Sequence, residues 1–180
     1  MKKYDRNEVK PATGESEQLP AGGYVLTITE CVDDEENERL QVEYDIAEGP
    51  HKGFYADIYS RTGYWRGKTI KSYKEKAQRF FEAFLQAVEA SNPGYQWDWK
   101  PESLVGKQVG AVMREEEYVG TDRESGKKVV RVRVTPDHFK SAEDIRSGKF
   151  KVRDRKPLKP EQRDEVAGFE DVSDDECPFE

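Results

Sequence analysis

The sequence predicts a mainly β fold of the α+β type, with five strands and one long helix. Three observations lead to this prediction. Several segments alternate apolar with polar residues or are rich in β-branched residues, the pattern of strands that bury one face. One segment of about twenty residues instead repeats its apolar residues with a helical period. Both ends are polar, and Pro and Gly interrupt the first of them, so regular structure is expected between the ends.

Three strands are expected before the helix. Residues 24–32 are rich in β-branched and aromatic side chains, and residues 40–46 alternate apolar with polar side chains. Residues 54–60 also alternate and are predicted to form the third strand. In that register one face carries Phe54, Ala56 and Ile58, and the other carries Tyr55, Asp57 and Tyr59. Turn-forming residues separate the three segments.

The helix is predicted over residues 69–90, and Asn92, Pro93 and Gly94 form a strong stop signal after it. Its apolar face comprises Ile70, Tyr73, Ala77, Phe80, Phe81, Phe84 and Val88. The fourth strand is predicted over residues 108–118. A polar hairpin loop then leads to the fifth strand, where Val130, Val132 and Val134 alternate with Arg131, Arg133 and Thr135.

An order of three strands, one helix and two strands fits the OB-fold, a small five-stranded Greek-key barrel with its helix between strands three and four. An α+β sandwich has the same elements and remains an alternative. Along the chain we expect a flexible lead over residues 1–19, an OB-fold-like domain over residues 20–155 and a disordered acidic tail over residues 156–180. The fold alone does not determine a function.

The charge of the chain is divided unevenly. Of its 180 residues 34% are hydrophobic and 37% are charged, and the formal net charge is -7. Residues 161–180 contain nine acids and one base, so the remainder is close to neutral. Within that remainder, residues 61–76 carry a net charge of +5 and residues 123–159 a net charge of +8. Such clusters indicate a polyanionic partner, with a solvated polar face as the alternative.

Single-stranded nucleic acid is bound by cations that contact phosphates and by aromatic rings that stack on bases, and the chain combines both. The candidate binding residues near the third strand and after it are Tyr55, Tyr59, Arg61, Tyr64, Trp65, Arg66 and Lys68. Those in and before the fifth strand are Lys127, Lys128, Arg131 and Arg133. Trp97 and Trp99 are expected to pack over one end of the barrel, although stacking on bases is the alternative.

Catalysis finds little support in the sequence. His51 and His138 have no neighbouring ligands at metal-binding spacing, and the segment from Gly63 to Thr69 is one residue short of a phosphate-binding loop. We therefore expect a protein that is not an enzyme and that uses no cofactor or metal. The absence of a signal segment and of a long apolar stretch favours a cytoplasmic protein that does not enter membranes.

The last residues form an acidic run followed by Pro178 and Phe179. This ending resembles the C-terminal tip of bacterial single-stranded-DNA-binding proteins, although Glu180 follows the Phe here. The resemblance covers Asp174, Asp175, Glu176, Pro178 and Phe179. It implies that the tip recruits replication or recombination enzymes in the cytoplasm of a bacterial cell or a phage-infected host. A homo-oligomer is compatible with this function.

Residues 19–135 are similar in overall pattern to proteins encoded by phages and mobile elements of Gram-positive bacteria, often beside recombination genes. The features that carry this similarity are the opening Leu19 to Tyr24, the turn around Gly49 and Pro50, and the long helix. Together with the tip, it implies a non-catalytic protein that binds and protects single-stranded DNA. The alternative is an adaptor whose barrel binds a protein partner instead.

Overall fold

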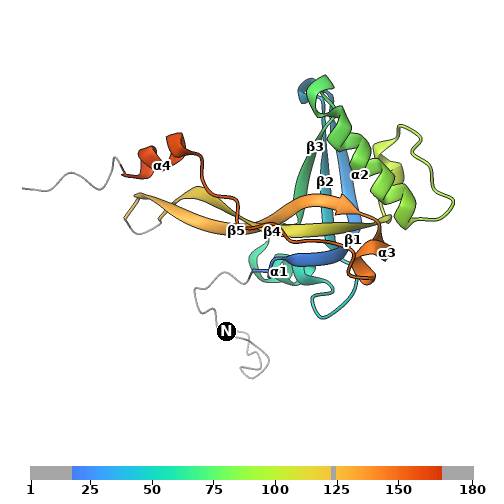
Figure 1. Cartoon of the computed structure of the whole chain (residues 1–180), viewed down its shortest axis with the longest axis horizontal. Helices are drawn as coiled ribbons and strands as arrows, with labels where there is room; N and C mark the ends of the chain where they lie inside the picture. The colour runs from blue at the N-terminus through green and yellow to red at the C-terminus, as the bar shows by residue number, and fades with distance from the viewer. Residues whose placement is uncertain (1–17, 123–124, 168–180) are drawn as a thin grey trace, which may run out of the picture.

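The protein is a five-stranded antiparallel sheet with a helix layer on each side (Figure 1), so the mainly β prediction is confirmed. The computed structural model describes residues 18–122 and 125–167. Its strands are β1 (Gly22–Asp34), β2 (Arg39–Ile46), β3 (Lys68–Ser72), β4 (Gln108–Thr121) and β5 (Lys128–Lys140), in the order β3-β2-β1-β4-β5. The α-helices are α1 (Phe54–Thr62), α2 (Gln78–Ser91), α3 (Ala142–Arg146) and α4 (Pro160–Ala167). Short 3-10 turns lie at η1 (Glu35–Asn37), η2 (Glu75–Ala77) and η3 (Pro101–Leu104).

The main core lies between one face of the sheet and helices α1 and α2. The apolar residues of β2 alternate as predicted, and Leu40, Val42, Tyr44 and Ile46 are all buried. The largest fully buried side chain of α2 is that of Phe84, which is 1% exposed. A second, smaller core on the opposite face joins Val25 and Val112 to α3. Burial on both faces explains the short runs of consecutive buried residues at Val25 and Leu26 of β1 and over residues 109–113 of β4, where strict alternation is lost.

Residues 54–60 form helix α1, so the prediction of a third strand there is wrong. Gly53, at φ 75°, turns the chain into the helix, and the carboxylate of Asp45 on β2 accepts hydrogen bonds from the backbone N–H groups of Tyr55 and Ala56 at 2.9 and 3.2 Å. These are donors that the first turn of a helix leaves without intrahelical partners. Tyr55 and Ile58, three residues apart, then face the core together.

The long helix begins at Gln78 rather than at residue 69, because the preceding residues form β3 and η2 instead. Lys74 has an extended backbone (φ -54°, ψ 146°), which breaks the helical pattern. Two residues assigned to the apolar helix face are consequently exposed: Ile70 by 56% on β3 and Phe80 by 62% on α2. The predicted stop is confirmed, since α2 ends at Ser91. The side-chain amide of Asn92 donates to the backbone carbonyl of Val88 at 2.7 Å.

The hairpin of β4 and β5 extends well beyond the rest of the sheet (Figure 1). Pairing of β1 with β4 stops at Met113, so residues 114–121 of β4 and 128–135 of β5 form a two-stranded arm. A segment over residues 150–158, here called the strap, returns along this arm. Lys156 pairs with Glu116 of β4 in a parallel bridge, and Leu158 is buried. The boundary predicted between residues 155 and 156 therefore falls inside the strap, and α4 follows it.

A closed barrel is not confirmed. The strand pairs among the described residues leave β3 and β5 as the two edges of an open sheet. The helix α2 does lie between the third and fourth strands, as the OB-fold prediction requires. At the edges, Lys71 of β3 extends its ammonium group over the ring of Phe139 on β5, with Nζ 3.9 Å from the ring centre. The edges thus contact each other through side chains.

Candidate nucleic-acid interface

Three predicted aromatic residues come together between α1 and β3. Tyr59, in the second turn of α1, is 51% exposed, and Tyr64, just after the helix, is 76% exposed. The ring of Trp65 meets that of Tyr59 edge to face, with 5.9 Å between ring centres. The Trp65 indole N–H donates to the carbonyl of Gly67 at 3.1 Å, which fixes its ring. The exposed rings of Tyr59 and Tyr64 therefore lie beside a tryptophan ring that a hydrogen bond holds in place.

Tyr55 does not belong to this surface, contrary to the prediction of an outward-facing tyrosine pair. It is 6% exposed and packs edge to face against Tyr44, with 5.4 Å between ring centres. Burial raises the pKa of its hydroxyl to about 12. The error follows from the secondary structure: a strand would place Tyr55 on the face opposite Ile58, whereas in helix α1 these two residues, three positions apart, face the core together.

The cations of the same connection have exposed side chains. Arg61 pairs with Asp57 one helical turn earlier at 2.9 Å, and Lys68 pairs with Glu43 of β2 at 2.7 Å. Arg66 lies between them in sequence and is also exposed. Ion pairs this open to water contribute little to stability, and a guanidinium keeps further donors when one carboxylate is bound. The three cations are therefore placed to contact phosphate beside the aromatic rings.

The remaining predicted cations lie on the arm and form a separate group. Arg133 donates to Glu116 at 3.1 Å and lies over the ring of Tyr118 at 5.2 Å. Arg131 is 3.9 Å from Asp122, at the edge of ion-pair range. Lys127 and Lys128 are exposed near the hairpin turn. This group therefore lies on other elements of the fold than the aromatic residues between α1 and β3.

A shallow groove of about 150 Å³ crosses the outer face of β1, β2 and β3, next to Lys68. Its exposed apolar residues are Val32 and Ile70, which lie at either side of Gln41 in adjacent strands. Sequence reasoning missed these residues because it placed Ile70 on a helix. Their large exposed fractions, 48% and 56%, are unusual for β-branched residues on a strand.

Other predicted features are either displaced or outside the described residues. Trp97 packs against the main core as expected, but Trp99 is 81% exposed. The tip residues Asp174, Asp175, Glu176, Pro178 and Phe179 lie outside the part of the chain that the structure describes. Within residues 18–122 and 125–167, no group of three or more His, Cys, Asp or Glu side chains could hold a metal ion. No helix in that part is long and apolar enough to cross a membrane.

The site and the fold together define a small antiparallel β protein with exposed rings and cations on one connection and on one arm. The chain belongs to the family described as "Protein of unknown function (DUF669)", whose model matches residues 2–136. The match includes the connection between α1 and β3 and ends within β5. No curated protein matches the chain.

Proposed function

We propose that this protein binds single-stranded DNA, without catalysis and with little sequence preference, and so protects it during replication or recombination. The observation that carries the proposal is the exposure of Tyr59 and Tyr64 beside Arg61 and Lys68, with the partly buried ring of Trp65 packed against Tyr59. Rings that stack on bases and cations that neutralise phosphates are the two requirements of single-strand binding. A sequence-tolerant mode follows because every base offers a flat face to a ring.

The strand order also supports an OB-type domain as part of this proposal. Strand β1 pairs with both β2 and β4, β2 continues to β3, and β4 continues to β5, as in a five-stranded barrel of that type. Contact of Lys71 with Phe139 brings the two edge strands together. Domains of this type bind oligonucleotides on the face of strands two and three and on the loop between strands four and five. Here those positions are the groove beside Lys68 and the arm.

The acidic tip has a different role in this proposal. Asp174, Asp175 and Glu176 would lie on a basic rim of a partner while Phe179 enters an apolar pocket, with Pro178 limiting the chain entropy lost on docking. The partners would be replication or recombination proteins in the cytoplasm. Removing residues 173–180 should abolish capture of such a partner and leave DNA affinity equal or higher.

A labelled oligo-dT titrated with the protein across a salt series tests DNA binding. Affinity should fall steeply with salt, because phosphate neutralisation releases counterions. Tyr64→Ala should cost about 1–3 kcal/mol, or roughly five- to 150-fold in Kd. Trp99→Ala is the matched control, since Trp99 is equally exposed and lies on a different loop. The proposal fails if the wild-type protein does not bind, or if both substitutions have the same effect.

The adaptor function is the second candidate, and Trp99 favours it. This residue is 81% exposed and has a left-handed backbone (φ 63°), a conformation that costs energy in a bulky residue. Exposed tryptophans that the fold holds in place are frequent anchors of protein interfaces. A chain that fails to bind oligo-dT but captures a protein partner, and loses that capture in Trp99→Ala, would establish the adaptor.

A further inference from the structure

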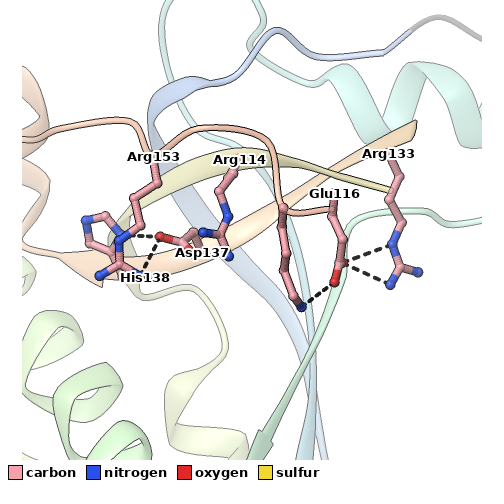
Figure 2. Close-up of polar contacts among 7 residues, drawn as sticks. Arg114, Glu116, Arg133, Asp137, His138 and Arg153 are labelled. Atoms are coloured by element: carbon pink, nitrogen blue, oxygen red, sulfur yellow. Dashed lines mark hydrogen bonds and ion pairs between the residues drawn. The ribbon is translucent and has the colours of Figure 1, made fainter. Parts of the chain in front are cut away.

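Two ion clusters lie side by side where the arm leaves the sheet (Figure 2). In the first, Asp137 contacts Arg114 at 2.8 Å, His138 at 2.9 Å and Arg153 of the strap at 3.2 Å. In the second, Glu116 contacts Arg133 at 3.1 Å and Lys156 of the strap. Four permanent cations thus surround two carboxylates, which leaves an excess charge of +2 without counting His138.

The carboxylates and the cations differ in their access to solvent. The side chain of Asp137 is 5% exposed and that of Glu116 is 19% exposed. By contrast, the side chains of Arg153, Arg133 and Lys156 are 62%, 55% and 52% exposed. Burial disfavours the charged form of Glu116, yet hydrogen bonds from Lys156 and Arg133 hold its pKa below the ordinary value. The side chain of Arg114 is 20% exposed, so three of the four cations, but not the fourth, are far more open to solvent than the carboxylates they contact.

Between the clusters lies a cleft of about 210 Å³. Its lining includes Arg114, Glu116, Thr135, Asp137 and Lys156, and its surface is mostly polar. Arginine suits such a site because the guanidinium has five donors in a planar fork, and one carboxylate oxygen uses only some of them. An anion that enters the cleft would meet donors already held in place, so little side-chain entropy would be lost on binding.

The cleft opens on the same face of the arm as two predicted DNA contacts. Arg114, Glu116 and Tyr118 alternate along β4, and Arg133 and Arg131 lie opposite the last two. Directly paired residues and every second residue share a face, so these cations follow one line along the arm. Neighbouring positions on that line are about 6.6–6.8 Å apart, since each residue of a strand rises 3.3–3.4 Å. A line of regularly spaced cations fits a flexible chain of phosphates better than a single small anion.

We propose that this cleft, which we call the strap cleft, binds phosphate groups of the single-stranded DNA backbone. The contacts come from Arg114 and Lys156, which line the cleft, and from Arg153, which pairs with the lining residue Asp137 at its border. The line of cations continues through Arg133 to Arg131. This inference rests on the proposed DNA binding and extends it to residues of the strap. The carboxylates of Asp137 and Glu116 act as positioning groups that hold the cations and do not touch the DNA.

The test compares oligo-dT binding of the full chain with that of the double variant Arg153→Gln/Lys156→Gln. Losing two phosphate contacts should lower the slope of log K against log salt by roughly 1.4 and weaken binding about 25-fold at 0.1 M salt. The matched control is Arg146→Gln, because Arg146 also pairs with one carboxylate, Glu48, at 3.0 Å and is 43% exposed. Arg153→Lys/Lys156→Arg keeps both charges and should retain most of the affinity. A melting curve of each variant confirms that it is folded.

The outcomes separate the two proposals. If the wild-type chain does not bind oligo-dT, the proposed function fails and the strap cleft fails with it. If the wild type binds but the double Gln variant matches Arg146→Gln, DNA binding stands and the strap cleft is refuted. Inorganic pyrophosphate at constant ionic strength identifies the other source of phosphate. If it stabilises the wild type but not the double Gln variant, and DNA affinity is equal in both, the cleft takes a free phosphate compound and the assignment to DNA is wrong.

Discussion

Replacing Lys71 by Met should stabilise the protein by about 1–2 kcal/mol at pH 7. Burial lowers the pKa of this lysine from 10.5 to about 8, which corresponds to a cost of about 3 kcal/mol for keeping the charge in the folded state. Attraction to the rings of Phe139 and Phe84, with Nζ at 3.9 and 5.5 Å from their centres, offsets about 1–2 kcal/mol of that cost. Methionine retains a flexible apolar stem of similar length and carries no charge.

The pH dependence of stability provides the sharper measurement. Because the pKa of Lys71 is lower in the folded state, the unfolded chain binds more protons between about pH 8 and pH 10.5. The free energy of unfolding of the wild type should therefore gain a contribution over this window that Lys71→Met lacks. The advantage of the variant should be largest at pH 7 and should shrink steadily as the pH rises from about 8 toward 10.5. Other groups with shifted pKa values, such as Tyr55 and Cys31, titrate in both proteins and cancel in the difference.

Urea unfolding followed by tryptophan fluorescence at pH 7, 8.5 and 10 measures this difference. Lys76→Met is the matched control, since Lys76 is exposed in η2 and its replacement should change stability by no more than about 0.5 kcal/mol. The reasoning is refuted if Lys71→Met is less stable than the wild type at pH 7. It is also refuted if the difference between the two proteins stays constant from pH 7 to pH 10.

Four further substitutions test how the fold positions the site. Asp45→Ala removes the acceptor of the first N–H groups of α1 and should cost about 0.5–2 kcal/mol, seen as a lower Tm and weaker helical signal in circular dichroism. Gly67→Ala places a Cβ atom against the carbonyl oxygen of Tyr44 and 2.9 Å from the ring of Tyr55, so a loss of more than about 2 kcal/mol is expected; an unchanged urea midpoint would contradict it. Phe84→Ala should cost about 3–5 kcal/mol and Phe80→Ala less than 1 kcal/mol, since the former is 1% and the latter 62% exposed; equal losses would show that the assignment of the core face is wrong.

The sequence predicted those elements whose pattern is set locally. Strand β2 follows simple alternation, and both the core role of Phe84 and the end of α2 follow from helical spacing and a stop signal. Helix α1 could not be predicted in this way, because residues 54–60 fit a strand pattern as well. The helix is favoured by the carboxylate of Asp45, ten residues earlier, which accepts from its first N–H groups, and by the burial of Tyr55 and Ile58 against the core. Tertiary contacts therefore overrode a plausible local pattern.

The two candidate sites differ in how far apart their residues lie in the sequence. The aromatic residues and cations between α1 and β3 could be predicted from the sequence, because Tyr64, Trp65 and Arg66 are consecutive residues. The strap cleft could not, because its cations come from β4 and from a strap about forty residues later. The net charge of +8 over residues 123–159 includes Arg153 and Lys156 but does not show that they lie beside Arg114. Only the difference in exposure between Asp137 and Arg153 reveals which sign faces the solvent.

The strap also protects an edge of the sheet that would otherwise be open to pairing with other chains. On the arm, β4 has lost β1 as a neighbour, and backbone hydrogen bonds with Lys156 occupy part of that open side. Phe150 covers Gly23 on β1 as well. A chain shortened to residue 136, where the family match ends, would leave a long unprotected strand edge, which is a template for pairing with other copies and for aggregation. The segment that protects the strand edge of the arm therefore lies beyond residues 2–136, the part of the chain that the family model matches.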